Sequence, residues 1–305
     1  MNDFCVITCY YNPVGYRSKR ENYELFVAGL EKSGISPLTV ECVFDSQEFD
    51  LLESPHVMRL RSQSVLWQRE RLVNLAVATL PESVRFVAWV DCDLIFSNPR
   101  WIFEAKQLLQ KVLVVQLYER CIRLPRGSRE YAGDGKSSVS FGAVTTRRPE
   151  VLLPGSVEKH GTTGYAWAAR REVFDVAGLY EGAIVGGADD YTAHAVYGDF
   201  ESECVARKMQ YDPVLMRHFR EWGERFHSVV QGKIGFVRGD ILHLWHGDLQ
   251  HRQYLDRHEM LGRLGYDPYR DICSYPGMPL EWSSCASDNL RAWIYDYFVN
   301  RREDE

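Results

Sequence analysis

Short apolar segments alternate with amphipathic helical segments through the first 117 residues of this 305-residue chain. Residues 21–32 and 64–80 carry apolar side chains at helical spacing, as in Leu72, Val73 and Ala76. This alternation is typical of α/β proteins, so we predict a mixed, mostly parallel sheet flanked by helices. The expected strands cover residues 4–10, 38–44, 57–60, 85–90 and 112–117.

The composition excludes several classes of protein. With 45% hydrophobic residues the chain can bury one sizeable core, which argues against disorder. Its 36 Lys and Arg stand against 42 Asp and Glu, so it lacks the overall positive charge that attracts proteins to nucleic acid. The eight cysteines form no C-x-x-C pair, which predicts reduced core thiols instead of a zinc ribbon or a disulfide framework.

The start of the sequence shows no targeting signal. Met1, Asn2 and Asp3 run directly into an apolar strand and leave no room for a signal peptide. The apolar runs elsewhere are shorter than the roughly 18 residues that a membrane span needs. We therefore expect a cytoplasmic protein with no membrane span.

An acidic motif, Asp91-Cys92-Asp93, follows the strand expected at residues 85–90. Asn98 and Pro99 then predict a helix over residues 99–110, so the motif lies in a strand-to-helix loop. Ligands bind at the carboxyl ends of strands in open α/β sheets, and carboxylates there can hold a divalent cation. The alternative is a polar strand end with one aspartate acting as a cap.

The second half of the chain is less regular. Residues 120–142 are rich in Gly, Ser and charge, which predicts a long surface loop. A helix is expected near residues 189–209 and a strand at residues 241–244. Helices are also expected at residues 250–264 and 289–300.

Two further motifs in this half could carry chemistry. His243 and His246 can converge on one metal only if the strand ends between them, and Gly247 allows such a turn. Gly186 and Gly187 precede Ala188-Asp189-Asp190, where a helix N-terminus would keep a carboxylate ionised. The alternatives are a core histidine beside a surface one, and ordinary helix capping.

The order of these motifs resembles that of GT-A glycosyltransferases, above all β-1,4-galactosyltransferases and polypeptide N-acetylgalactosaminyltransferases. The segment Trp67 to Asn74 is similar to a family helix whose aromatic and arginine side chains contact the nucleotide. The segment Gly164 to Phe174, with Gly178 to Glu181, is similar to the turn before the acidic motif. The resemblance implies a GT-A, Rossmann-like fold with a small helical C-terminal extension.

The resemblance also implies site residues and a cofactor. Asp93, His243 and His246 would bind Mn²⁺ or Mg²⁺, Asp189 would act as the general base, and Asp190 would be a second catalytic carboxylate. Ala188 departs from the family, which has a glutamate there that touches the acceptor. The donor-binding residues would be Tyr10, Trp67, Arg69, Asp91 and Gly187.

The implied function is transfer of a sugar from a nucleotide-sugar, with UDP as the expected nucleotide, to a hydroxyl acceptor with inversion. The acceptor could be a glycan, a small molecule, a protein or a modified DNA base. The alternatives are a retaining transferase acting on a modified DNA base, a sugar-nucleotide pyrophosphorylase and an inactive nucleotide-binding homologue. We expect a catalytic domain at residues 1–248, with nucleotide-binding (1–118) and acceptor-binding (119–248) halves, and a C-terminal extension at residues 249–305.

Overall fold

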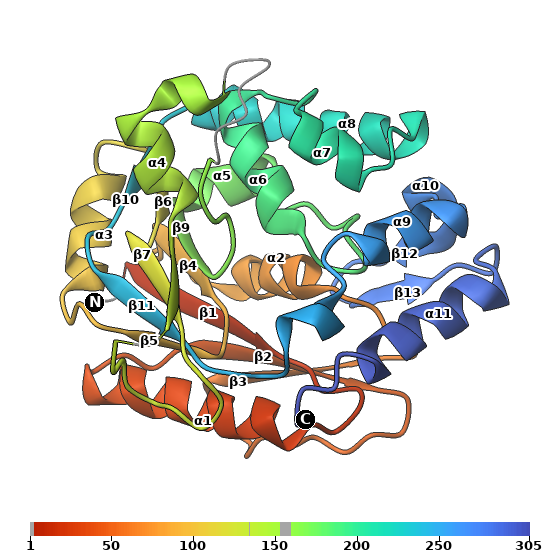
Figure 1. Ribbon diagram of the computed structural model, residues 1–305, viewed down its shortest axis with the longest axis horizontal. Coiled ribbons are helices and arrows are strands. Elements are labelled where there is room, and N and C mark those ends of the chain that lie inside the picture. The colour runs from red at the N-terminus through yellow and green to blue at the C-terminus, as the bar shows by residue number, and fades with distance from the viewer. Residues whose placement is uncertain (1–2, 134, 153–159) are drawn as a thin grey trace.

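The computed structural model describes residues 3–133, 135–152 and 160–305 and is built around a seven-stranded sheet (Figure 1). The strand order is β10-β6-β9-β4-β1-β2-β3. All neighbours are parallel except that β9 runs antiparallel to β4 and β6, which confirms the predicted mixed, mostly parallel sheet. The strands are β1 (Phe4–Tyr10), β2 (Leu38–Phe44), β3 (Val57–Ser62), β4 (Phe86–Val90), β6 (Val114–Gln116), β9 (Ala166–Arg170) and β10 (Ile234–Phe236).

Helices cover both faces of this sheet because its strands alternate apolar side chains between the faces. In β1, Val6 and Tyr10 pack on the side of α1 (Arg17–Lys32) and α3 (Trp101–Leu109). Ile7 and Cys9 of the same strand face the opposite core. Four helices cover that second face: α2 (Arg69–Thr79), α5 (Arg171–Val176), α6 (Ala188–Tyr197) and α8 (Pro213–Val230).

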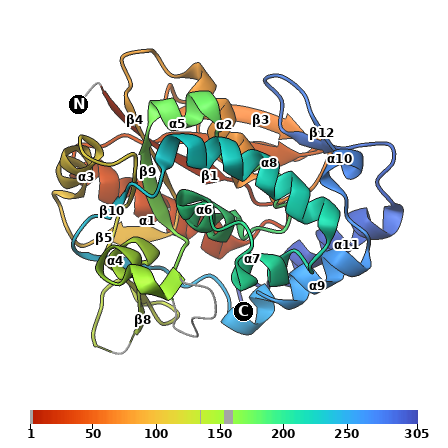
Figure 2. The same ribbon diagram turned by 90° about the horizontal axis from the view of Figure 1, so that it is seen from above.

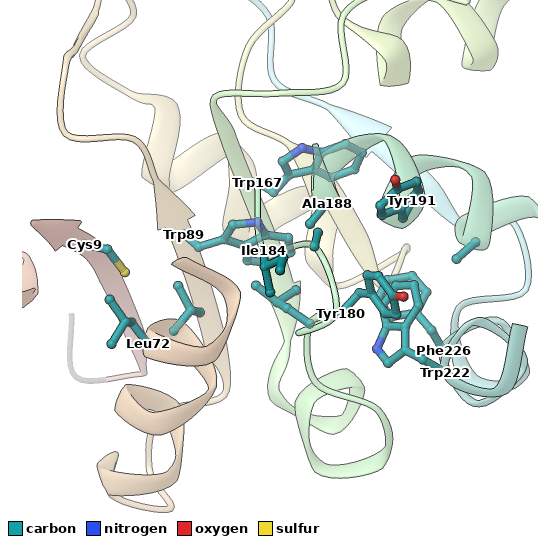
Figure 3. Close-up of a cluster of buried hydrophobic side chains, with 14 of the residues drawn as sticks. Cys9, Leu72, Trp89, Trp167, Tyr180, Ile184, Ala188, Tyr191, Trp222 and Phe226 are labelled. Carbon is teal, nitrogen blue, oxygen red and sulfur yellow. The ribbon is translucent and has the colours of Figure 1, made fainter. Parts of the chain in front are cut away.

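Aromatic side chains dominate this second core (Figure 3). Trp89 of β4 stacks parallel to Trp167 of β9, with ring centroids 6.3 Å apart. Trp222 and Phe226 come from α8, which runs beside α5 and α6 (Figure 2). The sequence reading missed α8, although Asp212 caps it and a proline occupies its first turn.

A four-stranded sheet, in the order β5-β11-β7-β8, lies beside the large one. The prediction of a loop over residues 120–142 is wrong at the two ends of the segment, which supply β7 and β8, whereas residues 124–133 between them are a loop. Cys121 and Ile122 of β7 are buried, so the segment is held by packing despite its polar composition. The strands are β5 (Leu94–Phe96), β7 (Arg120–Arg123), β8 (Lys136–Val139) and β11 (Asp240–His243).

Several predicted helices differ in extent from the observed ones. The helix expected at residues 189–209 is two helices, α6 and α7 (Glu203–Lys208), because the chain turns at Gly198 with φ +71°. The helix expected from Pro99 begins at Trp101, and Asn98 accepts a hydrogen bond from the N–H of Arg100 instead. The remaining helices of the first 248 residues are α4 (Phe141–Arg147) and the 3₁₀ helix η1 (Pro149–Leu152).

The C-terminal region contains a strand pair as well as helices. The helix expected at residues 250–264 is split into a 3₁₀ turn and α9, and the boundary predicted at residue 248 stays a prediction. In the part of the chain that is described, no helix has the length and apolar character of a membrane span. The elements are η2 (Leu249–Arg252), α9 (Asp256–Arg263), α10 (Pro268–Asp271), β12 (Ile272–Ser274), β13 (Leu280–Trp282) and α11 (Asp288–Val299).

Candidate active site

The Asp91-Cys92-Asp93 motif lies at the carboxyl end of β4, next to the centre of the large sheet. The backbone N–H of Asp91 donates to the carbonyl of Tyr165, just before β9 (2.9 Å). The carbonyl of Asp93 accepts from the N–H of Leu244, just after β11 (2.9 Å). These two bonds fix the acidic loop, and the second one brings the late histidine segment to it.

His243 and His246 converge on Asp93, as the sequence predicts. His243 ends β11, and His246 follows the strand end before a turn in which Gly247 has φ +86°. The Nε2 atoms of His246 and His243 lie 3.0 and 3.7 Å from Oδ2 of Asp93. The two Nε2 atoms are 3.2 Å apart, and all three ligand-type atoms lie within 4.8 Å of one another.

The chemistry of this Asp93 cluster fits a divalent cation. Oδ1 of Asp93 is buried and has no hydrogen-bond partner among the described residues. Burial lowers the pKa of His243 well below its ordinary value, so its imidazole is neutral, as a metal ligand must be.

Glu303 and Arg252, both from the C-terminal region, contact His246 of the Asp93 cluster. Oε1 of Glu303 lies 3.4 Å from Nδ1 of His246, on the side of the ring away from Asp93. Glu303 is itself held by the guanidinium of Arg301. Such a carboxylate orients a metal-binding imidazole. Nη2 of Arg252 lies 2.8 Å from Nε2 of His246, so this contact and a bound cation exclude each other.

Asp189 lies on another wall of the same cavity, in the first turn of α6. Its Oδ1 accepts from Nη2 of Arg69 (2.7 Å), whose other nitrogens contact Asp91 (2.8 Å) and Glu70. One guanidinium therefore serves three carboxylates and cannot neutralise them all. Burial, together with the charges of Asp91 and Glu70, raises the pKa of Asp189 to about 7. The helix dipole does not keep it fully ionised, contrary to the sequence expectation.

Asp190 has a different environment from its neighbour. It accepts a hydrogen bond from the hydroxyl of Thr163 (2.6 Å) and pairs with the ammonium of Lys208 from α7. Burial opposes its ionisation, but the charge of Lys208 outweighs burial and lowers the pKa of Asp190 to about 2. Asp190 is thus an ionised, fully partnered carboxylate, which suits a positioning role better than proton transfer.

The glycines before α6 let the backbone lie close to two side chains. Gly186 and Gly187 have φ +81° and +94°, which favours glycine. A Cβ at Gly186 would lie 3.2 Å from the indole of Trp67, and one at Gly187 would lie 3.2 Å from the ring of His258. Trp67 lines the cavity and stacks on Phe298, with ring centroids 6.5 Å apart.

Tyr10 is not brought to the cavity. Its ring is buried against Tyr23 on the opposite face of the sheet, and its hydroxyl donates to Asp50 (2.9 Å). Tyr11, the next residue, lines the cavity instead, because successive side chains of a strand point to opposite faces. The other nine predicted site residues all line the cavity, which has a volume of about 440 Å³.

The predicted site residues did not include several basic side chains around this cavity. Arg252, Arg257 and Arg301 come from the C-terminal region, outside any motif of the resemblance. The polar segment around residues 250–258 was the available signal, since its charges follow directly after the late histidines. The basic residues that line the cavity are Lys19, Arg69, Arg123, Lys208, Arg252, Arg257 and Arg301.

Comparisons with known proteins give structural similarities only. No protein-family model matches the sequence, and no curated protein is similar to it. Among solved structures, the catalytic domain of Drosophila β1,4-galactosyltransferase 7 in complex with xylobiose is 12% identical, with a TM-score of 0.41, covering 95% of this chain and 98% of that one. A mannosyl-3-phosphoglycerate synthase from Rubrobacter xylanophilus is 9% identical, with a TM-score of 0.41, covering 93% and 85%.

A 4-diphosphocytidyl-2C-methyl-D-erythritol synthase from Anaerococcus prevotii is also similar, at 10% identity and a TM-score of 0.38, covering 78% of this chain and 90% of that one. Similarity at this level leaves the function to be inferred from the site itself.

Proposed function

We propose that this chain is a metal-dependent glycosyltransferase that moves a sugar from a nucleoside diphosphate sugar to a hydroxyl acceptor. One observation carries the proposal: Asp93, His243 and His246 converge in the same cavity as Asp189, although they come from segments far apart in the chain. An inactive nucleotide-binding protein would not require both a cation site and a carboxylate of raised pKa.

The Asp93 cluster would hold the cation. One carboxylate and two imidazoles suit Mn²⁺ better than Mg²⁺, which prefers oxygen ligands. When bound, such an ion neutralises the negative charge of the diphosphate leaving group. With the cation in place, Arg252 would lose its contact with His246 and become available to a phosphate oxygen. Arg257, which also lines the cavity, could contact a phosphate oxygen as well.

Asp189 would take the proton from the acceptor hydroxyl. Its pKa of about 7 matches the protonation change that a general base needs near neutral pH. Arg69 holds Oδ1 of this carboxylate, which fixes the orientation of the group. Direct attack of the acceptor oxygen on the sugar carbon, with loss of its proton to Asp189, predicts inversion. Retention of the anomeric configuration would contradict this role.

The nucleotide would lie between Trp67 and Asp91, with Gly187 allowing close approach of the backbone. Trp67 is packed on Phe298 and under the guanidinium of Arg301, so it presents a rigid surface to a base. UDP is the nucleotide that we propose.

The eight cysteines are free thiols, which supports a reducing compartment such as the cytoplasm.

The acceptor is proposed only as a hydroxyl compound. Two arginines of the segment at residues 120–142 already have partners: Arg120 pairs with Asp240, and Arg126 lies over the ring of Trp245. Their engagement favours a glycan, a small molecule or a protein over a modified DNA base. A DNA acceptor would instead give activity that falls steeply with salt.

The experiment is a panel of nucleotide-sugars incubated with the purified protein and Mn²⁺, with release of nucleoside diphosphate as the readout. We expect metal-dependent release from one donor, reduced about 1000-fold in Asp93→Ala, because an active-site metal contributes several kcal/mol. The matched control is Asp240→Ala, outside the cavity. Release of pyrophosphate from a nucleoside triphosphate and a sugar phosphate would instead indicate a pyrophosphorylase, and no metal-dependent nucleotide binding would indicate an inactive homologue.

A further inference from the structure

A second cluster of metal-ligating side chains lies one helical turn beyond Asp190. His194 follows Asp190 by four residues on α6, and Cys204 precedes Lys208 by four residues on α7. The two helices therefore face each other with an ion pair at one level and a His–Cys pair at the next. His160 joins from a separate segment, and ligand-type atoms of His160, His194 and Cys204 lie within 4.8 Å of one another.

His194 is buried, and a carboxylate orients its ring. Its side chain is 2% exposed, and Nδ1 lies 2.9 Å from Oδ2 of Asp199. Nε2 is buried and makes no ordinary hydrogen bond to any described residue. A histidine with one nitrogen on a carboxylate and the other without a partner is the usual arrangement of a metal-bound imidazole.

His160 and Cys204 supply the other two donors. Nδ1 of His160 lies 3.2 Å from the carbonyl of Gly161, which leaves Nε2 as its available ligand atom. The rings of His160 and His194 are perpendicular, with centroids 5.0 Å apart. Sγ of Cys204 is the third donor of this group, and a thiol loses its proton when it binds a metal.

We propose that His160, His194 and Cys204 form a second metal site, for a zinc-class ion, separate from the Asp93 cluster. One thiolate and two imidazoles favour Zn²⁺ or Co²⁺ in tetrahedral geometry, whereas they suit Mn²⁺ and Mg²⁺ poorly. Bonds of about 2.0–2.3 Å require the three side chains to close in by roughly 1 Å. Three protein ligands leave the fourth position to water or another small donor.

Such an ion would connect the second site to the cavity. His160 is followed directly by Gly161, Thr162 and Thr163, which line the cavity, and Thr163 donates to Asp190. A metal bond to His160 would tie this segment to α6 and α7. The site would therefore stabilise one wall of the cavity without touching the reacting groups, and it does not depend on the proposed transferase activity.

The test uses Co²⁺ as a spectroscopic probe, because cobalt bound to a thiolate gives a charge-transfer absorption that the cysteine-free Asp93 cluster cannot produce. We expect chelator-treated protein to develop this absorption, saturating at one ion per chain, and added Zn²⁺ to remove it. Cys204→Ser should abolish the absorption. Cys285→Ser, at an exposed thiol, and Asp93→Asn should both retain it.

Two further variants keep the test decisive if Cys204→Ser folds poorly. His160→Gln changes a half-buried side chain and should weaken Co²⁺ binding at least tenfold. Asp199→Asn should weaken it about 10- to 100-fold, because it removes the carboxylate that orients His194. The proposal is overturned if no thiolate absorption appears, if the absorption survives Cys204→Ser, or if His160→Gln binds Co²⁺ as tightly as the wild type.

Discussion

Two sides of the cavity present aspartates to the same space but balance their charge differently. On the cation side, Asp93 faces His243, whose pKa is lowered by burial, and no described residue forms a hydrogen bond with Oδ1 of Asp93. On the base side, Asp189 contacts Arg69 and Asp190 contacts Lys208. A carboxylate paired with a charged arginine or lysine needs no external cation, whereas one that faces neutral imidazoles does.

The base side itself contains a second contrast. Asp190 has a lysine of its own and stays ionised, whereas Asp189 shares one arginine with two other carboxylates and has a raised pKa. Asp190 therefore has a structural role because Lys208 serves it alone, whereas Asp189 is suited to proton transfer because Arg69 is shared among three carboxylates. The variants below test these two roles separately.

Asp189→Asn should cause the largest loss on the base side. An amide cannot take the proton from the acceptor hydroxyl, so we expect kcat to fall about 100- to 10,000-fold. The Kd for the nucleoside diphosphate should change little. Steady-state kinetics and calorimetry with UDP and Mn²⁺ measure the two effects. Wild-type kcat in this variant would remove Asp189 from the mechanism.

Lys208→Met should lower stability instead of acting on the chemical step. It leaves Asp190 buried without its cation, which costs about 3 kcal/mol of unfolding free energy. Urea denaturation measures the change, and adding Asp190→Asn should recover part of it. The control is Arg263→Met, whose exposed pair with Glu259 should be worth less than about 0.5 kcal/mol.

Glu303→Gln should have a smaller effect on the reaction, through the cation side, and should also lower stability by weakening the buried pair with Arg301. The substitution keeps the shape of the side chain but removes the charge that orients His246, so Mn²⁺ should bind about 10- to 100-fold more weakly. Metal titration of the activity measures the shift, with Glu305→Gln as the control. If saturating Mn²⁺ does not restore the rate, Glu303 has another role.

A change of one pH unit should alter the reaction rate less than any of the substitutions above that act on the reaction. With a pKa of about 7, Asp189 is protonated at lower pH and cannot act as a base, so the rate should fall as pH decreases, approaching tenfold per unit below pH 7. The rate should level off above pH 7, where the carboxylate is ionised. A profile that rises toward acid would contradict this assignment, and the residual activity of Asp189→Asn should lack this limb.

The sequence predicted those parts of the molecule that depend on local pattern. The bounds of β1 and β2 were right because these strands are short, largely apolar segments with clear ends. The meeting of Asp93 with His243 and His246 was implied by the family resemblance, and the residues themselves indicated only that the two histidines could converge at a strand end. Asp189 could be placed through its glycine pair, although its raised pKa could not be predicted, because that shift depends on contacts with Arg69 and Asp91 from other segments.

The rest depended on tertiary contacts. Tyr10 was assigned to the wrong face because the sequence does not show which side of a doubly covered strand faces the cavity. Strands β7 and β8 were missed because each has only four residues and carries charged or polar side chains, and β8 lies at the edge of the small sheet. Glu303 and Arg301 reach the site only because the end of the chain folds back over it, and no local pattern indicates such a path.

The last residues of the chain also fasten it to its beginning. The carboxylate of Asp304 accepts hydrogen bonds from the N–H groups of Arg17 and Ser18 at the start of α1, next to Glu303 on His246. Cleavage by a trypsin-like protease after Arg301 or Arg302 would remove both Glu303 and Asp304. It would therefore break this contact with α1 and also take away the carboxylate that orients His246.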